Sequence, residues 1–152
     1  MAEFALIALP LVVGYGSSFA CKIGPEAGKT VMFRPPSTVF GIAWPILYLC
    51  MGTAWCLACR TSGVSKSRLV GVHVANALLL LTLVLWPVLY SCQKNRRAGV
   101  WVLLPALLFA ATVVCLAPAV VPRVLALPLL VWLGFALLMN AVEVQEMSRE
   151  NY

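Results

Sequence analysis

The chain has 152 residues, of which 62% are apolar and only 11% are charged, and its formal net charge is +6. A water-soluble domain typically carries about 25% charged and about 45–50% apolar residues, so this composition excludes an ordinary soluble fold and indicates lipid as part of the solvent. The basic residues lie in short gaps between apolar runs rather than on one soluble face, which disfavours nucleic-acid binding.

Five apolar runs without Lys, Arg, Asp or Glu follow one another along the chain, and each is long enough to span a bilayer. Each has about 18–23 residues, which as a helix matches the roughly 30 Å hydrocarbon core. The runs cover residues 4–21, 39–59, 69–91, 100–121 and 124–142. Because lipid cannot pair backbone polar groups, the spans must be helices. The sequence therefore predicts an all-α membrane protein, with residues 1–152 forming one compact bundle of five transmembrane helices.

An alternative interpretation of the first run is that it is a signal peptide. Its N-terminal flank holds Glu3 and neither Lys nor Arg, whereas a signal peptide begins with a positively charged region. We therefore expect a retained helix.

Charge bias between the connecting segments predicts the orientation of the bundle. With five spans, one side receives four cations, Arg60, Lys66, Arg68 and Arg123. The other side receives seven, Lys22, Lys29, Arg34, Lys94, Arg96, Arg97 and Arg149. Because cytosolic loops are enriched in Lys and Arg, the C-terminus is predicted to face the cytosol.

The six cysteines lie mostly inside the apolar runs, where a thiol behaves as a small apolar group. No disulfide framework is expected from this distribution. Cys56 and Cys59 have CxxC spacing, but no second pair completes a metal site, so a packed pair near a helix end is predicted.

Aromatic and small residues share a face of the second predicted helix and recur in the fifth. On the second helix the face consists of Phe40, Trp44, Tyr48, Met51 and Trp55, beside the small residues Gly41, Ala43 and Gly52. On the fifth it consists of Trp132, Ala136, Met139 and Asn140, beside Gly134. Such faces form either plain helix–helix interfaces or a pocket for a flat apolar ligand.

Polar groups inside the spans are few. His73 is expected near the interface, where water satisfies it, and Asn140 is expected to hydrogen-bond across helices. This scarcity argues against an ion pump or proton relay, and no hydrolase, phosphate-binding or zinc motif is present. Prolines such as Pro10, Pro45 and Pro87 predict kinked helices that open a cavity.

Two segments carry a family pattern. Residues 33–52, FRPPSTVFGIAWPILYLCMG, resemble W-x-P-P-x-W-x-F/L-x-P-x-W-x-x-L-Y-x-x-M-G, and residues 128–140, PLLVWLGFALLMN, resemble P-x-L-x-W-L-x-F-A-x-x-L-N. The step Trp86-Pro87 and the early Trp101 add to the likeness. The chain thus resembles the tryptophan-rich sensory protein family, also called the translocator protein or peripheral benzodiazepine receptor family.

The resemblance implies a five-helix bundle, often dimeric, that binds porphyrins, cholesterol and isoquinoline or benzodiazepine-type drugs. It implies a ligand pocket within the bundle, formed by Phe40, Gly41, Ala43, Trp44, Trp86, Trp101, Leu108, Trp132, Ala136 and Met139. Trp44 and Trp132 are the pair expected to stack on a tetrapyrrole, which would be a ligand rather than a resident cofactor. No catalytic residue and no metal ligand is predicted.

The chain departs from the family pattern at several positions. Phe33, Thr38 and Ile42 stand where the second-helix signature has Trp, Trp and Pro, and Pro105 replaces an acidic residue in the fourth helix. These changes predict a more apolar pocket than usual.

Three functional hypotheses follow. The leading one is a receptor or transporter-like membrane protein for apolar planar ligands. The others are an enzyme that degrades porphyrin under light and a ligand-free membrane interaction protein. The resemblance implies the outer mitochondrial membrane for a eukaryotic chain and an envelope membrane for a bacterial one.

Overall fold

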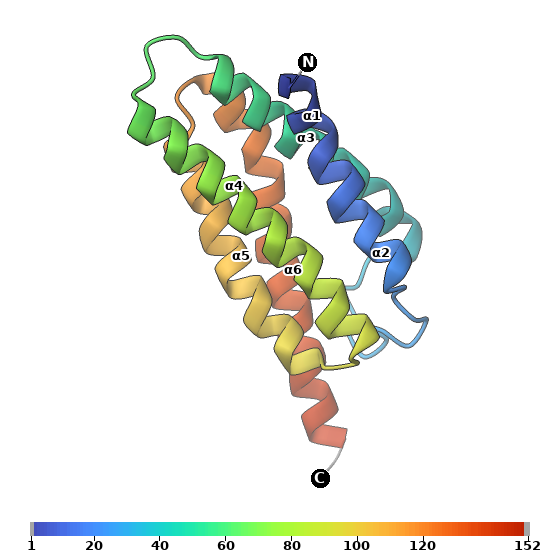
Figure 1. Cartoon of the computed structure of the whole chain (residues 1–152). Coiled ribbons are helices and arrows are strands. Elements are labelled where there is room, and N and C mark those ends of the chain that lie inside the picture. Colours follow the sequence, from blue (N-terminus) through green and yellow to red (C-terminus); the bar gives the residue numbers. More distant parts are fainter. Residues whose placement is uncertain (1, 151–152) are drawn as a thin grey trace.

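Long helices that run along one another make up the computed structural model, which describes residues 2–150 (Figure 1). They are α1 (Ala2–Leu9), the π-helix η1 (Pro10–Tyr15), α2 (Gly16–Ala20), α3 (Ser37–Arg60), α4 (Lys66–Pro87), the π-helix η2 (Val88–Cys92), α5 (Arg96–Leu116) and α6 (Val120–Glu150). No strand occurs among these residues, so the predicted all-α class is confirmed.

Four helices are long and apolar enough to cross a membrane: α3, α4 continued by η2, α5 and α6. The first predicted span is present as α1, η1 and α2 in direct succession. Its apolar part, Phe4–Ala20, is shorter than the other four.

The connection between the last two helices lies earlier than the sequence pattern predicts. We expected it at Pro122 and Arg123, whereas α5 ends at Leu116 and α6 begins at Val120. Pro118 ends the first of these helices because the residue before a proline avoids helical angles. Pro122 is accommodated in the first turn of α6, where a backbone N–H has no helical partner to lose.

Two of the prolines coincide with π-helical turns. Pro10 begins η1, and Pro87 directly precedes η2. A proline inside a helix leaves the carbonyl one turn earlier without its partner, and widening to π geometry is one way in which the chain adjusts. The prolines at these two positions therefore coincide with wider turns, whereas Pro45 lies inside the uninterrupted helix α3.

The packing order of the helices differs from their order in the chain. The segment from α1 to α2 packs on α3, α3 packs on α6, α6 on α5, and α5 on α4. The ring closes where α4 meets η1 and α2. As a result α3 and α6, which carry the two predicted aromatic faces, are neighbours (Figure 1).

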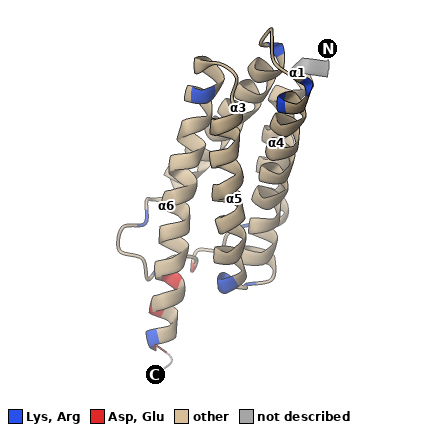
Figure 2. Ribbon diagram, turned by 90° about the vertical axis from the view of Figure 1, so that its left-hand side faces the viewer, with Lys and Arg blue, Asp and Glu red and all other residues tan. Residues whose placement is uncertain are grey.

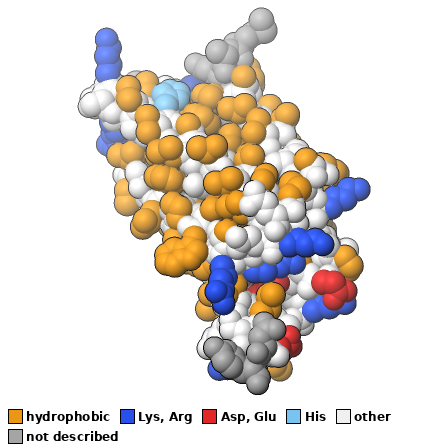
Figure 3. Space-filling view, turned by 60° about the horizontal axis from the view of Figure 1, so that its bottom comes forward, with side chains coloured by type: hydrophobic (Ala, Val, Ile, Leu, Met, Phe, Trp, Pro, Cys, Tyr) orange, Lys and Arg blue, Asp and Glu red, His pale blue; other side chains and the backbone are white. Residues whose placement is uncertain are grey.

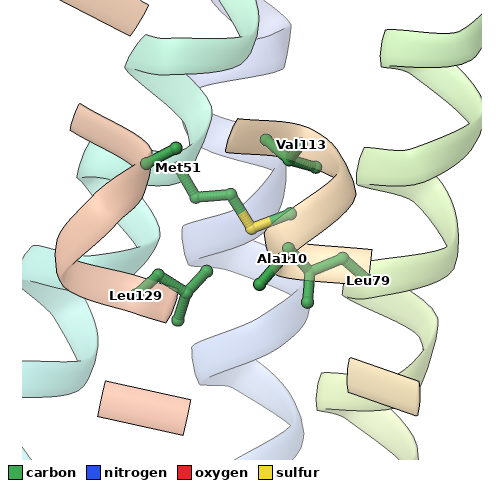
Figure 4. Close-up of a pocket in the computed structure, with 6 residues that line it drawn as sticks. Met51, Leu79, Ala110, Val113 and Leu129 are labelled. Atoms are coloured by element: carbon green, nitrogen blue, oxygen red, sulfur yellow. The ribbon is translucent and has the colours of Figure 1, made fainter. Parts of the chain in front are cut away.

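Side chains from all of the long helices fill the centre of the bundle. Met51, Leu79, Leu103 and Leu133 are each at most 2% exposed. Figure 4 shows Met51 reaching from α3 toward Leu79 and Ala110, beside an apolar void of about 10 Å³. A void of that volume holds about one water-sized probe, so it has no room for a planar ligand.

Charged residues lie at the two ends of the bundle, and the middle of each helix lacks them (Figure 2). Figures 1 and 2 place the loop between α2 and α3, the turn between η2 and α5, and the end of α6 together at one end. We call this the C-terminal end. The segregation of charge fits an apolar band that faces lipid.

A disulfide joins Cys21 to Cys92 at the C-terminal end, across 71 positions of sequence. This corrects the expectation that no cysteines pair. Both residues end apolar helices, Cys21 after α2 and Cys92 as the last residue of η2. The contact between α2 and α4 brings these ends together, which the order of the helices in the chain does not reveal.

The pairing predicts how many thiols the purified chain presents. Denatured without reductant, the chain should take up four maleimide–polyethylene glycol groups, on Cys50, Cys56, Cys59 and Cys115. After reduction it should take up six, because Cys21 and Cys92 are released. Gel mobility measures the number of adducts, and six adducts without reductant would rule out the disulfide in the isolated protein.

Candidate aromatic binding site

Four aromatic side chains meet where α3 packs on α6, and we call them the aromatic cluster: Phe40, Trp44, Trp132 and Phe135. The rings of Trp44 and Trp132 meet edge to face, with centroids 6.2 Å apart and planes at 84°. Phe40 and Phe135 pack on Trp132 at 5.7 Å and 5.8 Å. The residues come from one face of each helix, because positions three or four apart in a helix lie on the same side.

The loop before α3 covers one side of the aromatic cluster. Its Phe33 packs on Phe135, with ring centroids 6.1 Å apart. The guanidinium carbon of the next residue, Arg34, lies 5.7 Å from the centre of the Phe40 ring, which is the geometry of a cation–π contact. The aromatic cluster therefore has one positive charge at its edge.

The indole N–H of Trp132 is buried and has no hydrogen-bond partner. Buried polar groups are normally paired, and a donor left unpaired costs free energy. The Trp132 side chain itself is only partly buried. A ligand can therefore contact the exposed part of this ring, and its acceptor atom could pair with the N–H only if the groups that cover the nitrogen move.

A buried carboxylate holds the covering loop against the bundle. Glu143 of α6 is 4% exposed, and its Oε1 accepts a 2.8 Å hydrogen bond from the backbone N–H of Gly28. Its Oε2 accepts a 2.6 Å hydrogen bond from the Tyr90 hydroxyl. The guanidinium of Arg96 lies 3.4 Å from Oε1 and supplies the opposite charge. One side chain thus joins the loop, η2, α5 and α6.

Arg96 reinforces the same junction. It donates a 2.7 Å hydrogen bond to the Tyr90 carbonyl, and its guanidinium carbon lies 3.9 Å from the centre of the Tyr90 ring. Trp86 also stacks on the Tyr90 ring, with the two ring centroids 4.6 Å apart. The end of α4 is therefore fixed to the start of α5 beside the covering loop.

Comparison with known proteins identifies the family of this chain. The model of the TspO/MBR family matches residues 6–144. The chain is also 31% identical over 140 residues to a translocator protein homolog of Schizosaccharomyces pombe (strain 972 / ATCC 24843), covering 87% of this chain and 84% of that protein. The chain belongs to the TspO/MBR family. It is a membrane translocator-like protein, and the predicted resemblance is confirmed over nearly the whole sequence.

Several residues that the family resemblance assigned to a pocket do lie together in this member of the TspO/MBR family. Phe40, Trp44 and Trp132 form most of the aromatic cluster. Ala136 and Met139 follow on α6 and are 5% and 9% exposed. On α3, Ala43 is partly buried and Gly41 is exposed, with open space around the position of a Cβ atom. The structure thus brings Phe40, Trp44 and Trp132 together at the α3–α6 contact, whereas Gly41 faces open space.

Three predicted pocket residues lie elsewhere. Trp101 and Leu108 face outward from α5, with exposed fractions of 72% and 67%, which corrects their assignment to the bundle interior. Trp86 stacks on Tyr90 at the α4–η2 junction and is not part of the aromatic cluster. Because α5 is apolar all round, its sequence does not show which side faces lipid.

Two predictions about polar side chains were wrong. His73 accepts a 3.0 Å hydrogen bond from the Trp55 indole and lies 3.6 Å from the Cys59 sulfur, so protein groups and not only water satisfy it. Asn140 donates to the Ala136 carbonyl of its own helix rather than across helices. Among the described residues, no group of three His, Cys, Asp or Glu side chains is placed to hold a metal.

Sequence reasoning missed Glu143, Tyr90 and Arg96 as parts of the site. A usable signal existed, because an ionisable residue at the edge of an apolar span is a functional candidate by default. Glu143 directly follows the last predicted span, so hydropathy assigns it to a polar tail outside the helix. The tail contains neither Gly nor Pro, and α6 continues through it to Glu150.

Proposed function

We propose that this TspO/MBR protein binds a planar apolar ligand at the aromatic cluster, with a tetrapyrrole such as a porphyrin as the leading candidate. Sterols and isoquinoline or benzodiazepine-type compounds are further candidates. The observation that carries the proposal is the contact between Trp44 and Trp132, together with the unpaired indole N–H of Trp132.

The chemistry of the aromatic cluster suits a flat conjugated molecule. Indole faces stack on π-systems, and their large apolar area favours removal of such a ligand from water. The Trp132 N–H can donate to a ligand acceptor, which would remove the cost of the unpaired group. Arg34 at the edge of the cluster adds a partner for an acidic substituent, such as the carboxylates of a porphyrin.

Access to the aromatic cluster depends on the covering loop. Phe33 and Arg34 lie on the aromatic rings, and Glu143 holds the loop through its hydrogen bond from the Gly28 N–H. Since the void at the centre of the bundle is too small for a planar ligand, the proposed entry lies between this loop and the α3–α6 contact.

Replacing either tryptophan of the cluster should weaken binding. We expect Trp44→Ala and Trp132→Ala each to lower the affinity for protoporphyrin IX about tenfold, because an aromatic contact contributes about 0.5–1.5 kcal/mol beyond its buried area. Quenching of intrinsic tryptophan fluorescence during a porphyrin titration in detergent measures the dissociation constant.

Trp101→Ala is the matched control, because it removes the same ring from the outer face of α5. It should leave the affinity unchanged. Equal affinities for wild type and for a Trp44→Ala, Trp132→Ala double variant would refute the proposed site.

We also infer that the C-terminal end faces the cytosol, because it carries seven of the eleven Lys and Arg residues. The Cys21–Cys92 disulfide lies at this same end, whereas disulfides persist mainly in oxidising compartments. A cytosolic C-terminal end therefore implies that this pair is reduced in the living cell and oxidises after isolation.

A further inference from the structure

A second concave surface lies at the C-terminal end, away from the aromatic cluster. It is a cavity of about 400 Å³ between the turn that joins η2 to α5 and the last turns of α6. Its lining is Gln93, Lys94, Asn95, Arg96, Arg97, Val144, Met147 and Ser148. Figure 3 shows Lys and Arg side chains gathered at this end of the molecule, with Asp and Glu side chains among them.

The charge that lines the cavity has one sign. Lys94, Arg96 and Arg97 contribute three cations, and no Asp or Glu is among the lining residues. Arg96 is turned toward Glu143 and Tyr90, so its charge is partly compensated. Lys94 and Arg97 are exposed and form no ion pair with another described residue. The cavity therefore presents two uncompensated positive charges.

Neutral donors add to these charges. The Asn95 side-chain oxygen accepts the backbone N–H of Ala98, which leaves the amide N–H₂ group of Asn95 available to donate. Asn95 also caps α5, and the start of a helix carries partial positive charge. Cations and neutral donors together match the oxygen atoms of a phosphate group.

The position of Trp101 relates this cavity to the membrane surface. Trp101 is four residues after Arg97, so both lie on the same face of α5, and its ring is 72% exposed. Outward-facing tryptophans are enriched at the level of lipid headgroups. Val144 and Met147 add apolar surface to the cavity wall. An anion bound between Lys94 and Arg97 would therefore lie at headgroup level.

We propose that this cavity binds the phosphate headgroup of an anionic phospholipid, with the acyl chains remaining in the bilayer beside α5. Basic pockets at the cytosolic ends of membrane helices recognise lipid phosphate in this manner. The site is distinct from the aromatic cluster, because the two share no residue.

The test uses the full chain in a neutral detergent with dioleoylphosphatidylglycerol or dioleoylphosphatidylcholine. Native mass spectrometry measures the fraction of protein that retains lipid. We expect the anionic lipid to be retained more strongly than the zwitterionic one. The double variant Lys94→Gln, Arg97→Gln should weaken its binding roughly 20- to 30-fold, because each cation near an anionic lipid changes the affinity about fivefold.

Lys22→Gln with Lys66→Gln is the matched control, because it also removes two exposed cations but leaves the cavity intact. Its lipid binding should equal that of the wild type. An equal loss in both double variants would mean that only the overall charge matters and would overturn the site. Equal retention of the two lipids would also overturn it.

Inorganic phosphate distinguishes a lipid from a free anion. The proposal requires that millimolar inorganic phosphate leaves retention of the anionic lipid unchanged. Displacement of the lipid by phosphate at that concentration would show that the cavity takes a free phosphate ion and would overturn the assignment to lipid.

Discussion

Replacing Glu143 with alanine should destabilise the protein by about 3–5 kcal/mol. The substitution removes one partner of a buried ion pair and leaves Arg96 without its counter-charge. It also leaves the Tyr90 hydroxyl and the Gly28 N–H without their acceptor. The covering loop should then detach from α6 and its backbone should loosen, so that trypsin cleaves faster after Lys22, Lys29 and Arg34. Unfolding by sodium dodecyl sulfate and the rate of tryptic cleavage measure the two effects.

Glu146→Ala is the control for this experiment, because it removes the same side chain from the next turn of α6. Glu146 pairs with Arg149 at 3.0 Å, but the Arg149 side chain is 67% exposed, and surface pairs contribute only about 0–1 kcal/mol. Its stability and cleavage should resemble the wild type. If Glu143→Ala and Glu146→Ala unfold at the same detergent concentration, Glu143 does not hold the loop.

Glu143→Gln separates charge from hydrogen bonding. Glutamine retains one oxygen that can accept from Gly28 or Tyr90, but it cannot neutralise Arg96. Stability between that of the wild type and that of Glu143→Ala would show that both the charge and the acceptor atoms contribute to holding the loop.

The fold was predictable because membrane helices must satisfy their backbone groups internally and must match the bilayer thickness. The apolar runs alone therefore predicted the four helices that are long enough to span a membrane and the shorter helical segment that precedes them. The ends of the helices were less predictable. A hydropathy pattern shows where an apolar run meets charged residues, but the helix can continue beyond that point. Glu143 shows the difference, because α6 continues past it to Glu150.

Long-range pairings were the least predictable part. Glu143 contacts Gly28 and Tyr90 across 115 and 53 positions, and Cys21 pairs with Cys92 across 71. Alternating topology places all of these groups at one end of the bundle, yet it does not state which helices are neighbours. The ring order, in which α3 lies beside α6 and α4 lies beside α2, decides the contacts.

The aromatic cluster was predictable only in part, again because the order of the helices in the chain does not show which helices are neighbours. Trp44 and Trp132 each lie on a face with small residues, which predicts that both faces pack on other helices. Trp101 lies on a helix whose faces are all apolar, so a ring that faces lipid and a ring that faces the bundle look alike in sequence. The contacts of Phe33 and Arg34 depend on a loop that has no periodic pattern.

Small residues set how closely the first helical segment approaches α3. A Cβ atom added at Gly52 would lie 2.8 Å from both the Cα of Ile7 and the carbonyl oxygen of Leu6, which are backbone atoms of α1. Contacts under 3.0 Å with backbone cannot be relieved by a side-chain rotation, so α1 must move. In lipid, close packing of this kind is a main source of helix association.

Gly52→Ala should therefore destabilise the bundle by about 1–3 kcal/mol, the usual cost of overpacking. Gly134→Ala, a matched change inside α6, adds a methyl group where nothing lies within 4 Å. It should be neutral or stabilising by up to about 1 kcal/mol, because alanine is the better helix former. Unfolding in sodium dodecyl sulfate, followed by circular dichroism, compares the two variants. Equal midpoints for them would mean that α1 does not pack on α3 through Gly52, and the ring of helices would then be open at that contact.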